Sequence, residues 1–410
     1  MKNKRILTQP YVIAVMLYIA SIINYLDRAA IAISMVYISQ DISISAVDKG
    51  LVFSAFSIGY LPFNFLGGYL SDKMPPTKLF GICILLWSIL SGLTGTVASL
   101  WQLLIVRLLF GMSEGPLSSN INKIINDVFP KDTSVTWISI VDSATPIGTA
   151  VAGLLIPFFA IRYSWRMSFI IIMIVGITWS IVWCLLSKKL IKTNKPRQVS
   201  KMQIAGNKRT INTRKTFLFL NITIYYFLYN LFLYFLISWL PVYLMKIKTI
   251  NSNEKVIINS LPWLLGSGSM LLGGIFSRYL GKKKDFLQGY NYIKIIRFCL
   301  ACSSFSIILL GNIKEHIVVL LLILTFCVVA LYFTGGLYWG VINEIYPAQK
   351  VGTMGGIMHG CANLATVLGP IFVGIIVQFF NNYAVAFGLI GFIGIILLVI
   401  SNILLAKIKE

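Results

Sequence analysis

The chain has 410 residues, of which 57% are hydrophobic and only 12% are charged, and its mean hydropathy is +0.83. Soluble domains carry about twice that charged fraction, so the composition excludes a water-soluble fold. The formal net charge of +22 would fit a nucleic-acid-binding protein, but the basic residues stand in the polar segments between apolar stretches. We therefore expect a membrane protein with anionic lipid headgroups as neighbours and no nucleic acid as a partner.

Apolar stretches long enough to span a bilayer recur along the whole chain. A helix needs about 20 apolar residues to cross a hydrocarbon core of about 30 Å. The first stretch follows a basic N-terminus but lacks a small-residue cleavage site, so we expect it to be retained as the first helix. In chain order, the predicted spans are 11–38, 50–70, 78–98, 100–122, 135–160, 165–187, 216–245, 255–278, 291–311, 316–340, 352–378 and 382–406.

A basic segment divides these spans into two sets of six. Residues 188–215 contain ten Lys and Arg and no acidic residue, a composition that normally stays on the cytoplasmic side. An even number of spans on each side then places both termini in the cytoplasm as well. The predicted organisation is a six-helix bundle (1–187), a basic cytoplasmic linker (188–215) and a second six-helix bundle (216–410).

The two sets of spans resemble each other in sequence. GGYLSD (67–72) is echoed by GGIFSR (273–278), and VFPKDTS (128–134) by IYPAQKVG (345–352), each with an offset of a little over 200 residues. Two six-helix bundles in the same orientation are a parallel-repeat transporter architecture with a central site between them. The sequence therefore predicts an all-α membrane protein with twelve transmembrane helices in two parallel-repeat bundles.

Several motifs resemble the major facilitator superfamily and, within it, the anion:cation symporter family. GYLSDKMPPTK (68–78) is similar to the superfamily's signature loop. The closer family motifs follow in the expected order: NYLDRAAIA (24–32), GLVFSAFSIGY (50–60), RLLFGMSEGP (107–116), SWRMSF (164–169), FLISWLPVYL (235–244), LPWLLG (261–266) and GCANLATVLGP (360–370). The resemblance implies proton-coupled symport, by alternating access, of a small organic anion such as a hexuronate, an aldarate or galactonate.

A charge at bilayer depth costs roughly several kcal/mol unless it faces a cavity or a partner, so a short list of ionisable residues at that depth are candidates for function. They are Asp27, Arg28, Arg107, Glu114 and Asp142. Arg28 carries a planar, permanently charged guanidinium group, which suits bidentate capture of a carboxylate. The resemblance implies that Arg28 anchors the substrate's carboxylate. The alternative is a structural ion pair between the first and fourth helices.

Asp27 and Glu114 are candidates for proton coupling, because burial favours a neutral carboxyl group whereas a nearby arginine favours a charged one. The resemblance implies that protonation frees the arginine for the substrate, and that deprotonation restores the competing pair and expels the anion. Arg107 lies seven residues before Glu114 and so shares its helix face, which makes it a candidate coupling partner. An alternative position for Arg107 is the membrane edge, where long basic side chains snorkel.

Asp142 is an acid where the family pattern predicts a neutral residue. It is a candidate for a further coupling site, for the partner of an arginine, or for the end of a polar stripe with Ser139 and Ser143. Arg278 is a second departure, since the second half usually keeps an aspartate there.

For the rest of the cavity, the resemblance points to Tyr60, Thr145 and Asn363, whose hydroxyl or amide groups would bind a polyhydroxylated acid. Tyr25 and Asn24 are weaker candidates. The alternative for each is a hydrogen bond between helices, which is common in membrane bundles. His359 is expected to pack or to form a local hydrogen bond instead of relaying protons.

The signature loop is expected to contribute Gly68, Asp72 and Lys73 to the cytoplasmic gate instead of to the substrate site. Pro75 stands where the superfamily pattern has a glycine. The departure bears on the details of gating.

Other function classes find no support in the sequence. There is no HExxH motif, no Walker loop and no cluster of His or Cys ligands, so we expect no enzyme, no metal and no cofactor. The remaining alternatives are an exporter or a carrier of a non-anionic compound, and a transporter-like sensor. We expect a monomer in a bacterial inner membrane whose partners are a small organic anion and protons, and the sequence leaves the identity of that anion open.

Overall fold

A computed structural model describes residues 2–190, 213–247, 249–281, 288–313, 316–346 and 348–406. The described residues form fifteen helices: α1 (Lys2–Asp41), α2 (Ala46–Lys73), α3 (Pro76–Thr94), α4 (Leu100–Glu114), α5 (Leu117–Val128), α6 (Lys131–Asp142), α7 (Ala144–Arg162), α8 (Trp165–Leu190), α9 (Thr213–Lys246), α10 (Ser252–Gly281), α11 (Gln288–Leu310), α12 (Ile317–Thr334), α13 (Leu337–Ile345), α14 (Ala348–Phe380) and α15 (Tyr383–Ala406). A helix satisfies its own backbone hydrogen bonds, as lipid requires of a spanning segment. The predicted all-α membrane fold is confirmed.

Three predicted spans are each interrupted by a short break between two helices. Gly115 and Pro116 separate α4 from α5, Ser143 separates α6 from α7, and two glycines separate α12 from α13. Eleven segments of the described chain are long and apolar enough to cross a membrane. The predicted span 100–122 is not among them, although the other two interrupted spans are, because Gln102, Arg107 and Glu114 make it less apolar. Counting α4 and α5 as one interrupted crossing gives the predicted twelve.

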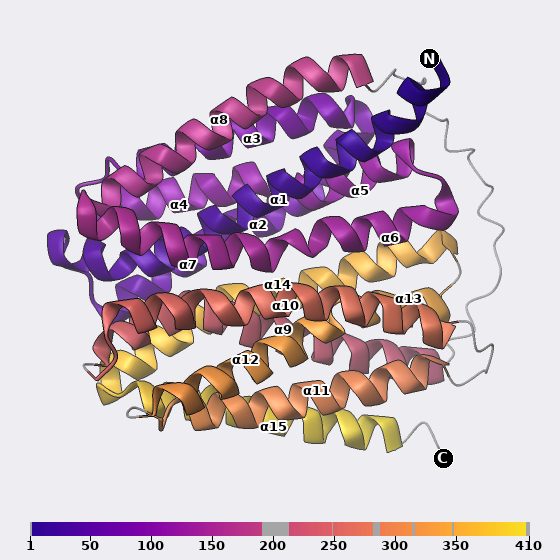
Figure 1. Cartoon of the computed structure of the whole chain (residues 1–410). Helices are drawn as coiled ribbons and strands as arrows, with labels where there is room; N and C mark the ends of the chain where they lie inside the picture. Colours follow the sequence, from indigo (N-terminus) through magenta and orange to yellow (C-terminus); the bar gives the residue numbers. More distant parts are fainter. Residues whose placement is uncertain are drawn as a thin grey trace.

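The helices form two halves that lie side by side, α1–α8 and α9–α15 (Figure 1). In the first half α1 packs on α7, α2 on α4 and α3 on α8; in the second, α10 packs on α12, α11 on α15 and α9 on α14. The basic linker predicted at 188–215 falls largely on residues 191–212, which lie outside the described chain. We call the end where α8 finishes and α9 begins the linker end. The opposite end, where α1 finishes and α2 begins, is the far end.

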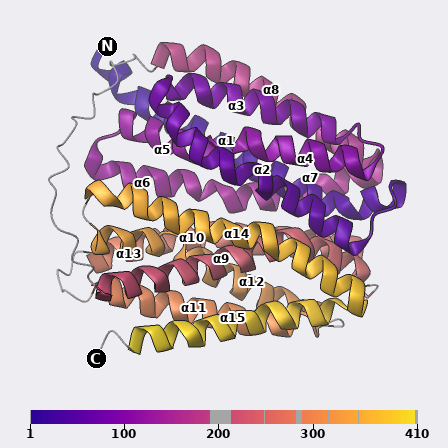
Figure 2. The same ribbon diagram turned by 180° about the vertical axis from the view of Figure 1, so that it is seen from behind.

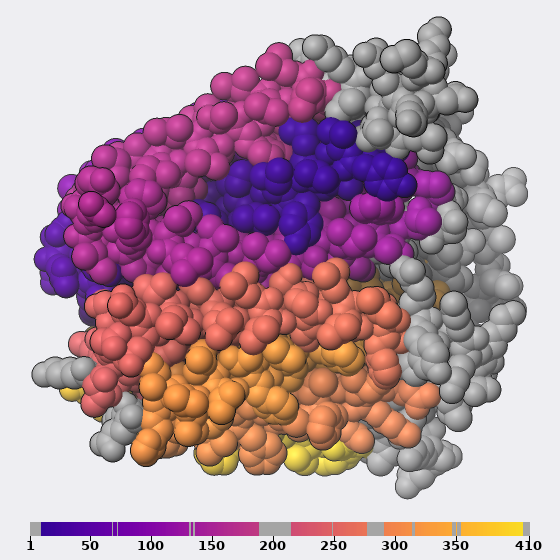
Figure 3. Space-filling view, viewed as in Figure 1, coloured from indigo at the N-terminus to yellow at the C-terminus, as the bar shows by residue number. Residues whose placement is uncertain are grey.

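The halves meet through three helix pairs, α2 with α14, α7 with α10 and α1 with α9. Figure 2 shows α2 beside α14, and Figure 3 shows the halves in contact along a continuous seam on the face that carries α7 and α10. At the far end the Val47 amide donates a 3.1 Å hydrogen bond to Gln378 Oε1, and the Ser54 hydroxyl donates one of 2.6 Å to the Val367 carbonyl. The far end is therefore closed by contacts between the halves.

Close helix approach fixes α4 against α2. A Cβ atom on Gly59 would lie 2.1 Å from the Leu108 carbonyl oxygen, and one on Gly111 would lie 2.0 Å from the Phe56 carbonyl oxygen. Small residues let helix backbones approach closely in this way. In a membrane no hydrophobic effect drives helices together, so this close packing is what holds them. The two glycines bring the polar face of α4 against Tyr60 of α2.

Candidate functional site

Arg28 lies buried midway along α1, where the two halves meet, and it contacts both of them. Its Nε donates a 2.8 Å hydrogen bond to Glu114 Oε2 at the end of α4, which makes a buried ion pair. Its NH1 group donates a 2.7 Å hydrogen bond to the Tyr234 hydroxyl of α9. Among the described residues, NH2 has no hydrogen-bond acceptor. The protein therefore engages Nε and NH1, and NH2 is the nitrogen left for a ligand.

Aromatic rings hold the guanidinium group of Arg28 in place. Its central carbon lies 4.8 Å from the ring centroids of both Phe56 and Tyr60 and 5.0 Å from that of Tyr25. Rings at this range attract a cation through their quadrupole and shield it from water. Tyr60, predicted from the family motif, is thus brought into direct contact with Arg28, as is Tyr25.

Arg107 lies in the middle of α4 with only 3% of its surface exposed, so its side chain is enclosed by the protein. Its guanidinium carbon is 4.7 Å from the ring centroid of Phe110 and 5.3 Å from that of Phe56. Arg107 Nε and Glu114 Oε1 are both buried without a hydrogen-bond partner. Glu114 is therefore only half satisfied by Arg28 and keeps an oxygen that can take a proton.

Asp27 faces away from Arg28 into the first half. The Ser91 hydroxyl of α3 donates a 2.5 Å hydrogen bond to its Oδ1, while its Oδ2 is buried without a partner. Adjacent residues on a helix point about 100° apart, which explains why Asp27 and Arg28 have different partners. All charged side chains that are buried in the described chain belong to the first half; they are Asp27, Arg28, Arg107 and Glu114.

The other predicted cavity residues lie apart from this cluster. Asn363 is buried in α14 and its amide donates a 2.9 Å hydrogen bond to the His359 carbonyl one turn earlier. Thr145 is half-buried in the first turn of α7. No described contact joins either residue to Arg28. His359 has the local hydrogen bond expected of it, with its Nδ1 3.2 Å from the Tyr226 hydroxyl.

Asp142 ends α6 at the helix break, inside the membrane-spanning segment Thr136–Arg162. Its side chain is exposed, yet it interacts electrostatically with Tyr226 of the second half, so it faces the interior and not lipid. Among the described residues it has no arginine partner and no hydrogen bond. Asp142 therefore stands at the break between α6 and α7, close to Tyr226 of the second half.

For the predicted gate, the structure describes the side chain of Lys73, whose Nζ lies 4.4 Å from the ring centroid of Tyr69. The surroundings of Gly68 and the side chains of Asp72 and Arg278 lie outside what the structure describes. The Lys123 ammonium group donates to the Ser71 carbonyl in the same loop region.

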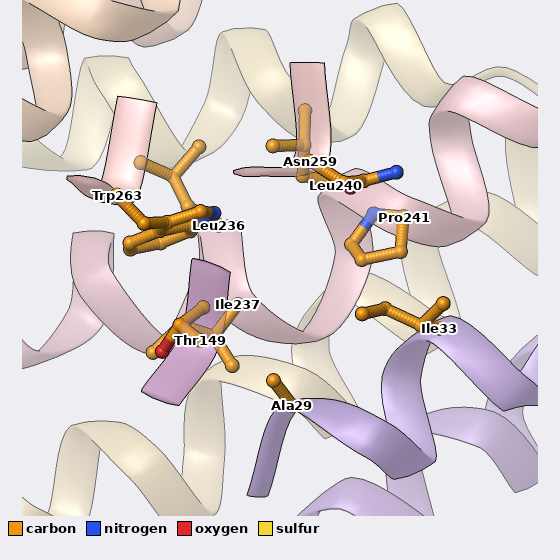
Figure 4. Close-up of a pocket in the computed structure, with 9 residues that line it drawn as sticks. All are labelled: Ala29, Ile33, Thr149, Leu236, Ile237, Leu240, Pro241, Asn259 and Trp263. Atoms are coloured by element: carbon orange, nitrogen blue, oxygen red, sulfur yellow. The ribbon is translucent and has the colours of Figure 1, made fainter. Parts of the chain in front are cut away.

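A small pocket lies between the halves beside Arg28. Figure 4 shows its lining, which comes from α1, α7, α9 and α10 and is mostly apolar: Ala29, Ile33, Thr149, Leu236, Ile237, Leu240, Pro241, Asn259 and Trp263. A second pocket shares Ile33, Pro241 and Asn259 and continues past Lys255 toward the far end. The first pocket holds no charged group, so it marks the seam between the halves and not the anion site.

Sequence reasoning missed Tyr234, Phe56 and Ser91. Each supplies a direct contact to the charged cluster, but none stands out in sequence, because tyrosine, phenylalanine and serine are common in apolar helices. Tyr234 reaches Arg28 across 206 residues of chain. Only the packing of α9 on α1 brings the two together.

Comparison with known proteins agrees with this geometry. The model of the Major Facilitator Superfamily matches residues 17–359. The hexuronate transporter of Bacillus subtilis is 36% identical over 92% of this chain and 90% of its own length. The probable galactarate/D-glucarate transporter GarP of Escherichia coli K12 is 25% identical over 100% of this chain and 97% of its own length, and the D-galactonate transporter of Escherichia coli O6:H1 is 24% identical over 95% of each.

Solved structures share the fold. A bacterial homolog of the human lysosomal transporter Spinster, inward-facing and unoccupied, has a TM-score of 0.74 at 17% identity and covers 97% of this chain and 96% of its own. A mutant of the nucleoside transporter NupG has a TM-score of 0.68 at 15% identity and covers 95% of this chain and 99% of its own. The relatives and the neighbours are transporters and not enzymes.

Proposed function

Since the chain belongs to the Major Facilitator Superfamily and is an integral multi-pass transporter, we propose that its substrate is a sugar acid of the hexuronate type and that protons drive its uptake. The observation that carries this proposal is the buried Arg28, whose NH2 has no acceptor among the described residues while Glu114 holds Nε. Once Glu114 releases Nε, a carboxylate can accept two parallel hydrogen bonds from the edge formed by Nε and NH2. The named sugar-acid relatives support the substrate class.

Glu114 is proposed as the proton-coupling residue because it competes with the substrate for Arg28. Protonation of Glu114 neutralises the carboxylate that holds Nε, so the guanidinium charge becomes available to the anionic substrate. Loss of the proton restores the ion pair and weakens the hold on the substrate. Asp27 is proposed as a second proton site, with Arg107 between the two carboxylates in charge balance.

The sugar hydroxyls are proposed to meet Tyr60, Thr145 and Asn363. A rocking motion of the two halves would bring Thr145 of α7 and Asn363 of α14 toward the substrate once it is held by Arg28. The signature loop with Gly68, Asp72 and Lys73 would close the opposite side, and Asp142 would line the exit.

We place the linker end in the cytoplasm, because the ten basic residues of 188–215 favour that side, and the far end outside the cell. Both termini are then cytoplasmic, and the membrane is the bacterial inner membrane. A monomer is sufficient for this mechanism, since the two halves of one chain supply both sides of the site.

The test is uptake by purified protein in liposomes with an imposed inward proton gradient and labelled D-glucuronate as the probe. Arg28→Ala should lower kcat/KM by about 10- to 100-fold, because a hydrogen bond to a charged group contributes about 1.5–3 kcal/mol. Glu114→Gln should still exchange labelled for unlabelled substrate but should no longer accumulate it against a gradient.

The same experiment tests the alternatives. Uptake that ignores the proton gradient in the parent protein would refute coupling. Normal uptake by Arg28→Ala would refute the anchor. Binding without flux would identify a sensor, and movement of a neutral compound alone would identify a different carrier.

A further inference from the structure

Three lysines gather at the far end around the mouth of the seam between the halves. Lys49 is in the first turn of α2, Lys246 ends α9 and Lys255 is in the first turn of α10. Lys49 and Lys255 are half-buried and Lys246 is exposed. Lys255 lines the second pocket together with Pro241, and the ammonium groups of Lys49 and Lys246 interact electrostatically. Three positive charges thus stand at the far-end edge of the closed seam.

The carboxylates at this end hold helix ends and not these lysines. Asp48 Oδ2 accepts hydrogen bonds of 2.9 and 2.7 Å from the amide and hydroxyl groups of Ser45. Glu254 Oε2 accepts a 2.8 Å hydrogen bond from the Asn251 amide. Among the described residues, no carboxylate lies within ion-pair distance of any of the three lysines.

Asp41 is engaged as well. Its Oδ2 accepts a 2.9 Å hydrogen bond from Trp165 Nε1 and pairs with the Arg166 guanidinium group. The three lysines therefore lack an ion-pair partner among the described residues, and they outnumber the two neighbouring carboxylates, Asp48 and Glu254. Like charges placed together repel, and basic residues are normally sparse in segments outside the cytoplasm. A cluster of three lysines at this end therefore fits the binding of an anionic ligand.

We propose that Lys49, Lys246 and Lys255 form a peripheral capture site for the carboxylate of the incoming sugar acid. The inference rests on the proposed function, because it takes the substrate to be an anion that enters from the far end. Ammonium groups on flexible stems bind anions as point charges without fixing their orientation. Such a site holds the substrate weakly, raises its concentration at the seam and passes it on to Arg28 when the far end opens.

The test measures D-glucuronate uptake as a function of concentration in intact cells that make the full chain. The variant Lys49→Gln/Lys246→Gln/Lys255→Gln should raise KM roughly 3- to 10-fold at low ionic strength and leave the maximal rate unchanged, since steering changes encounter and not transport. The difference should shrink at about 0.2 M salt, where charges are screened within about 7 Å. Replacing the same lysines by arginine should preserve the parent KM.

Arg162→Gln is the matched control. It removes one positive charge from the same end, but the Arg162 guanidinium group rests 5.9 Å from the ring centroid of Phe158 on its own helix. An equal rise of KM in this control, or an unchanged KM in the triple variant, would overturn the capture site while parent uptake still supported the proposed function. If the parent moved no sugar acid, both proposals would fall.

Lipid phosphate is the other source of anionic oxygens at this depth. Reconstitution into vesicles of zwitterionic lipid alone, with and without added phosphatidylglycerol, separates the two sources. A KM effect that persists without anionic lipid supports capture of substrate. An effect that requires anionic lipid would overturn the proposal.

Discussion

At the residue scale, the arrangement around Arg28 assigns a distinct part to Tyr234. Among the described residues, its hydroxyl makes the one hydrogen bond between the second half and the charged cluster. Arg28, Glu114 and Asp27 were predicted from sequence because a charge inside a membrane span is costly unless it faces a cavity or a partner. Tyr234 was not, because its role depends on which helix faces α1.

Tyr234→Phe should reduce kcat/KM for D-glucuronate by roughly 10-fold, because it removes a hydrogen bond to a charged group and keeps the ring. The matched control is Tyr243→Phe on the same helix, whose hydroxyl donates to the Leu310 carbonyl at 3.2 Å. The decrease in the logarithm of kcat/KM for Tyr243→Phe should be no more than a few tenths of the decrease for Tyr234→Phe. Equal losses in both variants would show that Tyr234 acts through the stability of α9.

Asp142→Asn tests the carboxylate that we propose lines the exit. Because Asp142 contacts neither Arg28 nor Glu114, we expect proton-driven accumulation to persist. Removing a negative charge from the path of an anion should also tighten D-glucuronate binding by roughly 2- to 5-fold, with Asp142→Glu close to the parent protein. Loss of accumulation in Asp142→Asn would instead make this residue part of the coupling.

At the scale of elements, the sequence predicted where the chain crosses the membrane but not where the crossings break. Hydropathy reports the length of an apolar stretch, and that signal is continuous through Ser143 and through the two glycines after α12. The breaks matter for function, since Glu114 and Asp142 each occupy the last residue of an interrupted helix. At these positions Glu114 binds Arg28 of α1, and Asp142 interacts with Tyr226 of α9.

The contact between α2 and α4 yields a prediction about folding. Gly111→Ala should lower the yield and the melting temperature of the purified protein, because its Cβ would meet the Phe56 carbonyl oxygen at 2.0 Å and backbone cannot move aside cheaply. Gly274→Ala is the control, since a Cβ there meets nothing within 4 Å. Similar melting temperatures for the two variants would show that α2 and α4 separate without cost.

At the scale of the whole molecule, the far-end closure must open once in every transport cycle. Val47 of α2 and Gln378 of α14 are joined by a hydrogen bond there. A short bifunctional thiol reagent applied to the Val47→Cys/Gln378→Cys variant should block uptake, and cleavage of the link should restore it. Either cysteine alone, treated in the same way, should leave uptake intact, which also controls for the native cysteines.

The two halves contribute unequally to the site. The charged side chains that are buried in the described chain all stand on α1 and α4, whereas α9 and α14 contribute uncharged groups such as Tyr234 and Asn363. The groups proposed for proton coupling and for holding the carboxylate therefore belong to one half. A chimera that joins residues 1–190 to the second half of a galactonate-type relative should keep proton drive and the carboxylate anchor and change only the contacts of the second half, so diversification within such a lineage can proceed by exchanging a single half.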